Sequence, residues 1–219
     1  MATTERRGRP RSDREARGRA LVQAALDVFA EKGFAGARLD DVAARAGVAK
    51  GTIYLYFATK DALFEAVVKS RILPTVARIE ALAADGRTPS EDLLRGAIGA
   101  FYREVVAGEG REVLRLLLAE APRFPSLAAF YHDAVIACGL AALKAIIARG
   151  VARGEFKEGP VTRRPEAVMG PAILAAVWKI AFEAHRPLDL DAYVEAHCAL
   201  ALAGLKAGTP STAAAGGAI

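Results

Sequence analysis

The chain has 219 residues, 53% of them hydrophobic and 25% charged, which is typical of a globular protein with one large or two modest cores. Its two cysteines show neither CxxC spacing nor a paired histidine, which argues against a disulfide scaffold and a zinc site. The net charge of +5 comes from the first 60 residues, with 12 basic and 7 acidic side chains, because the remainder has 18 of each.

The polarity of the chain bears on its location and on the partner of its basic end. No apolar stretch of the signal-peptide type begins the chain, and no run of about 18 charge-free apolar residues follows, so we expect a soluble cytoplasmic protein without a membrane role. A localised basic excess suits a surface that binds a polyanion, since each neutralised phosphate releases counterions. A solvated basic tail would have the same charge, so charge alone leaves both alternatives open.

The pattern of apolar residues predicts an all-α fold, because most of the chain is rich in helix formers and alternating β-branched runs are absent. Residues 1–11 are polar and Arg-rich, which indicates a disordered basic arm. Ser12 and Glu15 form a capping-box pattern at the start of the first helix, and Gly33 is expected to end it.

Two short helices and a longer one are predicted next. Residues 39–46 and 50–57 each place apolar side chains at helical spacing, and Gly47 between them can adopt the positive φ of a tight turn. Thr59 is the expected N-cap of the longer helix, which begins at Lys60. The two short helices together form a helix-turn-helix.

The outward face of the second short helix has groups that suit DNA. Its glycine lets the backbone approach closely, its threonine can contact a phosphate, a base edge or a thymine methyl, and its lysine and tyrosines can bind phosphates or bases. The start of the next helix adds a lysine and a positive helix terminus. The predicted DNA-binding residues are Arg38, Lys50, Gly51, Thr52, Tyr54, Leu55, Tyr56 and Lys60.

These residues resemble the DNA-binding domain of the TetR family of regulators. The resemblance covers residues 12–70 and depends on Ala46-Gly47-Val48 and on the run GTIYLYF-x-x-K, which follow GF and L-x-x-V-A. It implies about nine helices, a homodimer joined by the last two long helices, and a C-terminal domain in which a small molecule binds and releases the DNA. Two recognition helices about one DNA turn apart would bind a near-palindromic operator.

The chain departs from the family pattern at the start of both short helices. The family usually has Thr or Ser just before Leu39, where this chain has Ala37 and Arg38, and often Ser where this chain has Ala49. Arg38 could replace the lost phosphate contact through its charge. We therefore expect both short helices to lack a side-chain N-cap.

The C-terminal half contains fewer motifs. The stretch LLLAEAPRFPSLAAFYHDAV resembles the C-terminal domain of the AefR-like subset of the family, through AE-x-x-RFP-x-L. Its aromatic residues fit a largely apolar ligand pocket, but ordinary core packing, or a subunit interface at Trp178 and Phe182, would also explain them. The candidate pocket residues are Phe101, Tyr102, Leu117, Phe124, Phe130, Tyr131, Trp178 and Phe182.

The predicted organisation is a disordered arm (1–11), a helix-turn-helix domain (12–74), a helical ligand-binding and dimerisation domain (75–206) and a disordered tail (207–219). We predict a transcription regulator, a repressor by family habit, which binds a DNA operator as a homodimer, needs no cofactor, and is released by a small apolar or amphipathic molecule. No nucleophile–base pair, paired carboxylates, phosphate loop or metal-ligand spacing favours an enzyme. The alternative, a nonspecific or architectural DNA-binding protein, would not need a neutral, aromatic-rich second domain.

Overall fold

The structure, a computed structural model, describes residues 11–206, and every regular element in that range is helical. The predicted all-α fold is therefore confirmed. The predicted arm lies outside the described residues except for Arg11, the first residue of the first helix, and the predicted tail lies wholly outside them. The described chain forms two compact units, one made of residues 11–70 and 116–130 and the other of residues 71–115 and 131–206.

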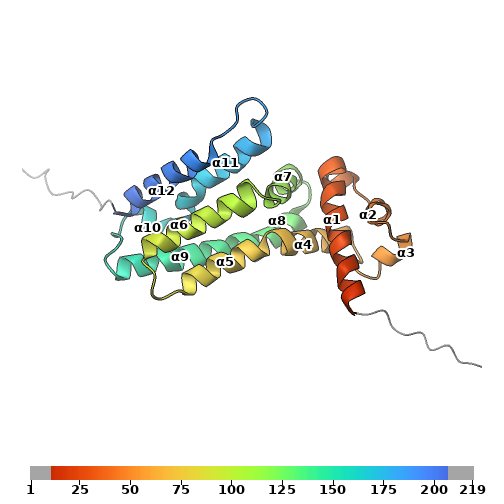
Figure 1. Cartoon of the computed structure of the whole chain (residues 1–219), viewed down its shortest axis with the longest axis horizontal. Coiled ribbons are helices and arrows are strands. Elements are labelled where there is room, and N and C mark those ends of the chain that lie inside the picture. Colours follow the sequence, from red (N-terminus) through yellow and green to blue (C-terminus); the bar gives the residue numbers. More distant parts are fainter. Residues whose placement is uncertain (1–10, 207–219) are drawn as a thin grey trace, which may run out of the picture. The chain divides into compact units, whose positions relative to one another are not determined.

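The first unit contains the N-terminal helices, coloured red to orange in Figure 1. They are α1 (Arg11–Gly36), α2 (Leu39–Arg45), α3 (Lys50–Ile53) and α4 (Lys60–Arg71). Leu21, Ala25 and Val28 follow one another at helical spacing and are buried on one face of α1, as the sequence predicts. Helix α2 packs against both α1 and α3, so α1 supports the helix-turn-helix.

The core of the first unit is built around the ring of Phe34. Its centroid lies 5.5 Å from that of Phe29, 6.0 Å from that of Phe64 and 4.9 Å from that of Phe124. These tilted and edge-on contacts add to the burial of large apolar side chains, which is worth about 1.5–3 kcal/mol each. Because Phe124 is distant in sequence, residues 116–130 complete the core of the N-terminal unit.

The glycines lie at two helix breaks, but Gly33 kinks α1, which continues to Gly36, and the second short helix is shorter than predicted. Gly33 has a φ of 68° and Gly47 a φ of 66°, a region that favours glycine. Helix α3 ends at Ile53, not at Phe57. The N–H groups of Leu55 and Tyr56 donate to the carbonyls of Thr52 and Ile53, three residues back, so this turn is tighter than an α-helix.

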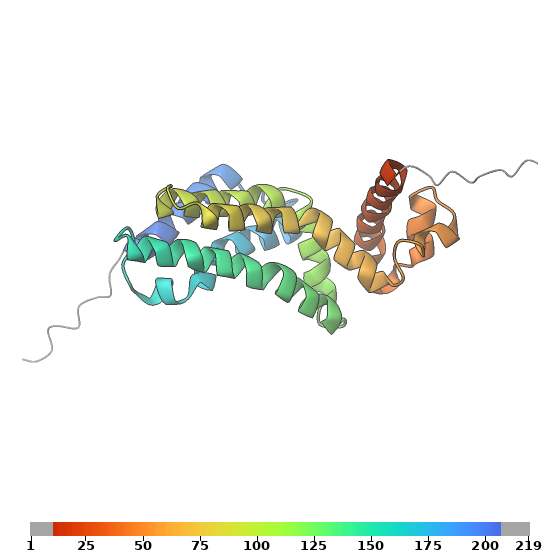
Figure 2. The same cartoon turned by 90° about the horizontal axis from the view of Figure 1, so that it is seen from below.

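The second unit is a helical bundle together with the connecting helices around it. From α5 onward the elements, with the π-helical segments η1 and η2 and the 3-10 segment η3, are α5 (Leu73–Ala84), α6 (Ser90–Phe101), η1 (Tyr102–Val106), α7 (Gly110–Glu120), α8 (Pro125–Tyr131), η2 (His132–Ile136), α9 (Ala137–Ala152), α10 (Pro160–Arg163), η3 (Pro165–Met169), α11 (Gly170–Ala181) and α12 (Leu190–Lys206). Of these, the second half of α7 and all of α8 except Tyr131 belong to the first unit. Helices α5, α6 and α9 pack against one another and lie side by side in both views (Figures 1 and 2).

One helical run in the described residues, Pro125–Ala152, is long and apolar enough to cross a membrane, with a mean hydropathy of 1.9 over 18 residues. Length and composition are weak evidence for a span, because core helices of soluble proteins meet the same test. The run also contains Lys144 and Arg149, so it is not charge-free. Within the run, α9 packs against α5 and α6.

Candidate nucleic-acid interface

Both short helices begin without a side-chain N-cap, as the sequence predicts. Arg38 precedes α2 in an extended conformation, and Ala49 precedes α3. The backbone N–H of Arg38 donates to Oδ2 of Asp41 (3.2 Å), which is three residues further on. A hydrogen bond from Lys32, with a smaller contribution from this N–H, lowers the pKa of Asp41. An acidic side chain thus stabilises the start of α2 in place of the usual hydroxyl.

The outward side of α3 and its following turn is open. A Cβ added to Gly51 would have no atom within 4 Å, so another molecule can approach the backbone there. Tyr54 and Leu55 are 50% and 74% exposed. The residue before them, Ile53, is fully buried in the core of the unit. Large exposed apolar side chains next to a buried anchor are typical of a surface that contacts another molecule.

Lys50 is exposed, but its charge has a partner. Its Nζ lies 2.6 Å from Oδ2 of Asp40 on α2, and 70% of its side chain is exposed. The hydrogen bond from Lys50 to Asp40 raises the pKa of Lys50. A DNA phosphate would therefore compete with Asp40 for this ammonium group.

Lys60, which the sequence predicts as a DNA contact, lies against the end of α1. Its Nζ donates to the backbone carbonyls of Phe34 (2.5 Å), Ala35 (3.1 Å) and Ala37 (3.2 Å). It also lies 4.6 Å from the centroid of the Phe34 ring. A lysine at a helix C-terminus satisfies carbonyls that have no intrahelical partner and interacts favourably with the helix dipole.

Glu120, at the end of α7, is an acidic residue that binds the same turn as Lys60. Its Oε1 accepts hydrogen bonds from the N–H groups of Phe34 (3.0 Å) and Ala35 (3.4 Å). A Cβ at Gly33 would lie 2.6 Å from this oxygen, so the contact requires glycine. No local pattern in the sequence points to Glu120, because its contact with Phe34 spans 86 residues.

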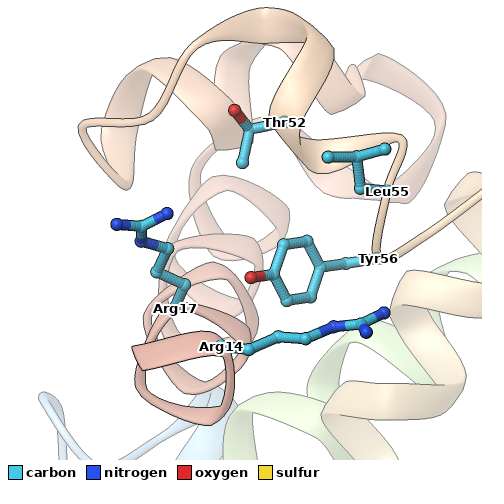
Figure 3. Close-up of a pocket in the computed structure, with 5 residues that line it drawn as sticks. All are labelled: Arg14, Arg17, Thr52, Leu55 and Tyr56. Carbon is cyan, nitrogen blue, oxygen red and sulfur yellow. The ribbon is translucent and has the colours of Figure 1, made fainter. Parts of the chain in front are cut away.

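A groove between α1 and the turn after α3 has a volume of about 450 Å³ and is lined by Arg14, Arg17, Thr52, Leu55 and Tyr56. Figure 3 shows the Tyr56 ring directed toward α1, with Arg14 running alongside it and Arg17 nearby. The guanidinium carbon of Arg14 lies 5.8 Å from the centroid of that ring. The structure thus brings three predicted DNA-binding residues next to two arginines that were not predicted to bind DNA. The two arginines are three residues apart, which places them on one face of α1.

Two family models match the chain over most of its described length. The model of bacterial regulatory proteins of the tetR family matches residues 21–67, and the model of the tetracyclin repressor-like C-terminal domain matches residues 83–201, which is more than half of the chain. The chain belongs to the TetR family. The narrower expectation of the AefR-like subset stays a prediction.

Individual proteins agree with this membership in the TetR family. The regulator RutR of Escherichia coli K12 is 39% identical over 85 residues, which cover 39% of this chain and 39% of RutR. The uncharacterised regulator YvdT of Bacillus subtilis is 40% identical over 60 residues, or 27% of this chain and 31% of YvdT. The chain thus spans about a third of the length of these curated relatives.

One solved structure extends the similarity to the whole fold. The regulator FadR from Bacillus subtilis, in complex with stearoyl-CoA, is 23% identical and has a TM-score of 0.69, covering 85% of this chain and 98% of FadR. At this identity the likeness concerns the fold alone.

The residues proposed from the sequence for a ligand pocket are divided between the two units of this TetR-family chain. Leu117, Phe124 and Phe130 belong to the first unit. There Phe124 packs against Phe34, and the Phe130 ring lies 5.3 Å from Nζ of Lys69. These contacts give two of the three residues a packing role in the N-terminal unit.

The other five candidates lie in the second unit, in different surroundings. Phe101 is half-buried at the end of α6, and burial raises the pKa of the nearly inaccessible Tyr131 to about 12. The rings of Trp178 and Phe182 meet edge-on at 5.4 Å, and Phe182 is 47% exposed. The structure therefore brings Trp178 and Phe182 together, with Trp178 half-buried and Phe182 exposed.

Tyr102 is buried against a histidine. Its hydroxyl lies 3.1 Å from Nδ1 of His197, whose Nε2 lies 2.7 Å from the carbonyl of Val168. Because a carbonyl only accepts, Nε2 holds the proton and Tyr102 donates to Nδ1. Burial lowers the pKa of His197 and raises that of Tyr102, which keeps both groups neutral. The two side chains thus satisfy each other's buried hydrogen-bonding groups, together with the Val168 carbonyl.

Proposed function

We propose that this protein is a homodimeric DNA-binding transcription regulator, a repressor that a small apolar or amphipathic molecule releases from its operator. The observation that carries the proposal is the helix-turn-helix of α2 and α3, whose outward face is open while Ile53 anchors α3 in the core. The domain division proposed is residues 12–74 for DNA and residues 75–206 for effector and dimer. The proposed action is binding and release without catalysis.

Each residue of the recognition surface is proposed to have its own role in DNA binding. Exposed Tyr54 and Leu55 would contact bases or sugar edges, Gly51 would allow close approach, and Lys50 and Arg38 would bind phosphates. For Lys60 the geometry supports an indirect role, because its ammonium group holds the end of α1 against the unit.

Exposed apolar residues on the last two long helices support the dimer. Ile173 and Leu174 on α11, Phe182 just after it and Leu200 on α12 are between 43% and 64% exposed. Apolar groups of this size on neighbouring helices would be covered in a four-helix interface with a second copy. Such a dimer would place two helix-turn-helix units on one near-palindromic site.

The effector proposed is amphipathic, with a long-chain acyl-CoA as the first compound to test. The support is the fold, which this chain shares with a regulator solved with stearoyl-CoA. An apolar chain with a polar head also suits the apolar composition of the second unit, whose buried polar pair, Tyr102 and His197, is internally satisfied.

The decisive experiment is a gel-shift titration of the full-length protein against DNA upstream of its own gene and against a scrambled duplex. We expect tighter binding to the upstream DNA at about 150 mM salt and release on addition of stearoyl-CoA. Tyr54→Ala is expected to weaken this binding by about tenfold without changing the dimer or the melting temperature, because Tyr54 is half exposed.

Each unfavourable outcome of this titration has its own meaning. Equal affinity for both duplexes would overturn the specific regulator in favour of a nonspecific DNA-binding protein. Release by neither stearoyl-CoA nor shorter acyl-CoA compounds would overturn this class of effector. Unfolding of the Tyr54→Ala protein would show that Tyr54 is a core residue.

A further inference from the structure

The cations of the first unit differ in whether they are free to meet a ligand. Lys50 is paired with Asp40, Lys60 is bound to three carbonyls, and Arg45 forms two short bonds with Glu31 (2.5 and 2.6 Å). Among the described residues, no hydrogen bond or ion pair engages the side chain of Arg14 or Arg17. Arg14 and Arg17 on α1 thus keep their charge available, unlike Lys50 and Lys60 of the family motif, whose ammonium groups already have internal partners.

The Tyr56 ring lies against α1 beside Arg14, in the groove that Arg17 also lines. Arg14, Arg17 and Gly18 lie on one face of α1, because they are three and four residues apart. A Cβ at Gly18 would lie 3.8 Å from the Tyr56 ring, so the ring rests against the helix backbone between the two arginines. A guanidinium stacked on an aromatic ring keeps its in-plane N–H donors available for an anion while losing part of its freedom.

The chemistry of the groove selects an anion with an apolar neighbour. Two guanidinium groups and the Thr52 hydroxyl can donate, the exposed Leu55 side chain offers an apolar rim, and the lining contains no carboxylate. A phosphodiester with its attached sugar has this combination of a charged and an apolar part. Thr52 and Leu55 also belong to the face that the proposed function places against DNA.

We propose that the groove between α1 and the turn after α3 is a binding site for a DNA backbone phosphate, held by Arg14 and Arg17. The proposal depends on the proposed function, and it extends the DNA-binding surface from the helix-turn-helix to the first helix. Because a phosphate carries no sequence information, this contact fixes the position of the unit on the duplex and adds affinity to any sequence.

The test is the salt dependence of DNA binding, measured by fluorescence anisotropy between about 50 and 200 mM NaCl. The full-length wild type, Arg14→Gln, Arg17→Gln and the double variant are titrated with upstream and with scrambled duplex. We expect the double variant to bind both duplexes about tenfold more weakly at the higher salt concentration. The slope of log K against log salt is negative, and we expect it to become less steep by about one.

Arg19→Gln is the matched control, since it removes the same charge from the same helix on a face well away from the groove. It is expected to keep the wild-type slope. An unchanged slope in the double variant, or an equal loss in Arg19→Gln, would overturn the phosphate site. Failure of the wild type to prefer the upstream duplex would count against the proposed function alone, because the slope can still be read on the scrambled duplex.

Discussion

The two ends of helix α1 hold their polar groups in opposite ways. At the C-terminal end, Lys60 and Glu120 are both bound to the backbone around Phe34. At the N-terminal end, Arg14 and Arg17 face an open groove. The position of a charged residue in a motif therefore does not determine its role. Lys60 lies inside the family motif but binds backbone carbonyls, whereas Arg14 and Arg17 remain available to a ligand.

The largest loss of stability is expected from replacing Gly33, the glycine at the kink near the C-terminal end of α1. Gly33→Ala would strain a residue with φ 68° and ψ 170°, and its Cβ would displace Glu120 from two N–H groups. We expect the free energy of unfolding to fall by about 3 kcal/mol. Urea denaturation followed by circular dichroism measures this.

Gly36→Ala is the control for that variant, because a Cβ there makes only ordinary contact, 3.7 Å from Cβ of Lys32. It should leave stability unchanged or slightly raised. Equal stability of the Gly33→Ala and Gly36→Ala proteins would mean that the turn is not locked, and the contrast between the two ends of α1 would then fail.

A smaller loss is expected for Lys60→Met, which keeps the aliphatic stem but removes the ammonium group from three carbonyls. We expect about 2 kcal/mol of stability to be lost, measured in the same way. Lys69→Met on the same helix removes an exposed lysine paired with Glu65 and should cost less than about 1 kcal/mol. A Lys60→Met protein that is as stable as the wild type but binds DNA poorly would restore the role that the sequence predicts for Lys60.

The sequence predicted those features of the fold that depend on neighbours along the chain. The helix-turn-helix, the break at Gly33, the positive φ of Gly47 and the Thr59 cap all follow from spacing and residue type. The Thr59 hydroxyl accepts a hydrogen bond from the N–H of Ala62 (3.1 Å). The start of α6 differs, because the N–H of Ser90 donates to Glu155 (2.5 Å), a contact across 65 residues that no local pattern indicates.

The sequence could not predict which polar groups the fold uses internally. Glu120 meets Phe34 across 86 residues, and Lys60 meets it across 26, so neither contact leaves a periodic pattern. The groove could not be predicted for the same reason, because Arg14 lies 42 residues before Tyr56 and is one of many charges in a basic segment. A pattern of residue types locates a binding face, but only the tertiary contacts tell which of its charges are available.

The smallest effect is expected from releasing Lys50 from its ion pair with Asp40. Asp40→Asn removes the partner that holds its ammonium group at 2.6 Å, and it also removes a negative charge from the face proposed for DNA. We expect DNA binding to strengthen by about two- to fivefold near 100 mM salt, the range of an exposed ion pair, as measured by fluorescence anisotropy. Asp41→Asn makes the same charge change next to Lys32 and leaves the Lys50 pair intact. If both variants gain equally, general charge accounts for the effect. If only Asp40→Asn gains, and Lys50→Gln abolishes the gain, then the internal partner of Lys50 limits its contribution to DNA binding, as the contrast with Arg14 and Arg17 requires.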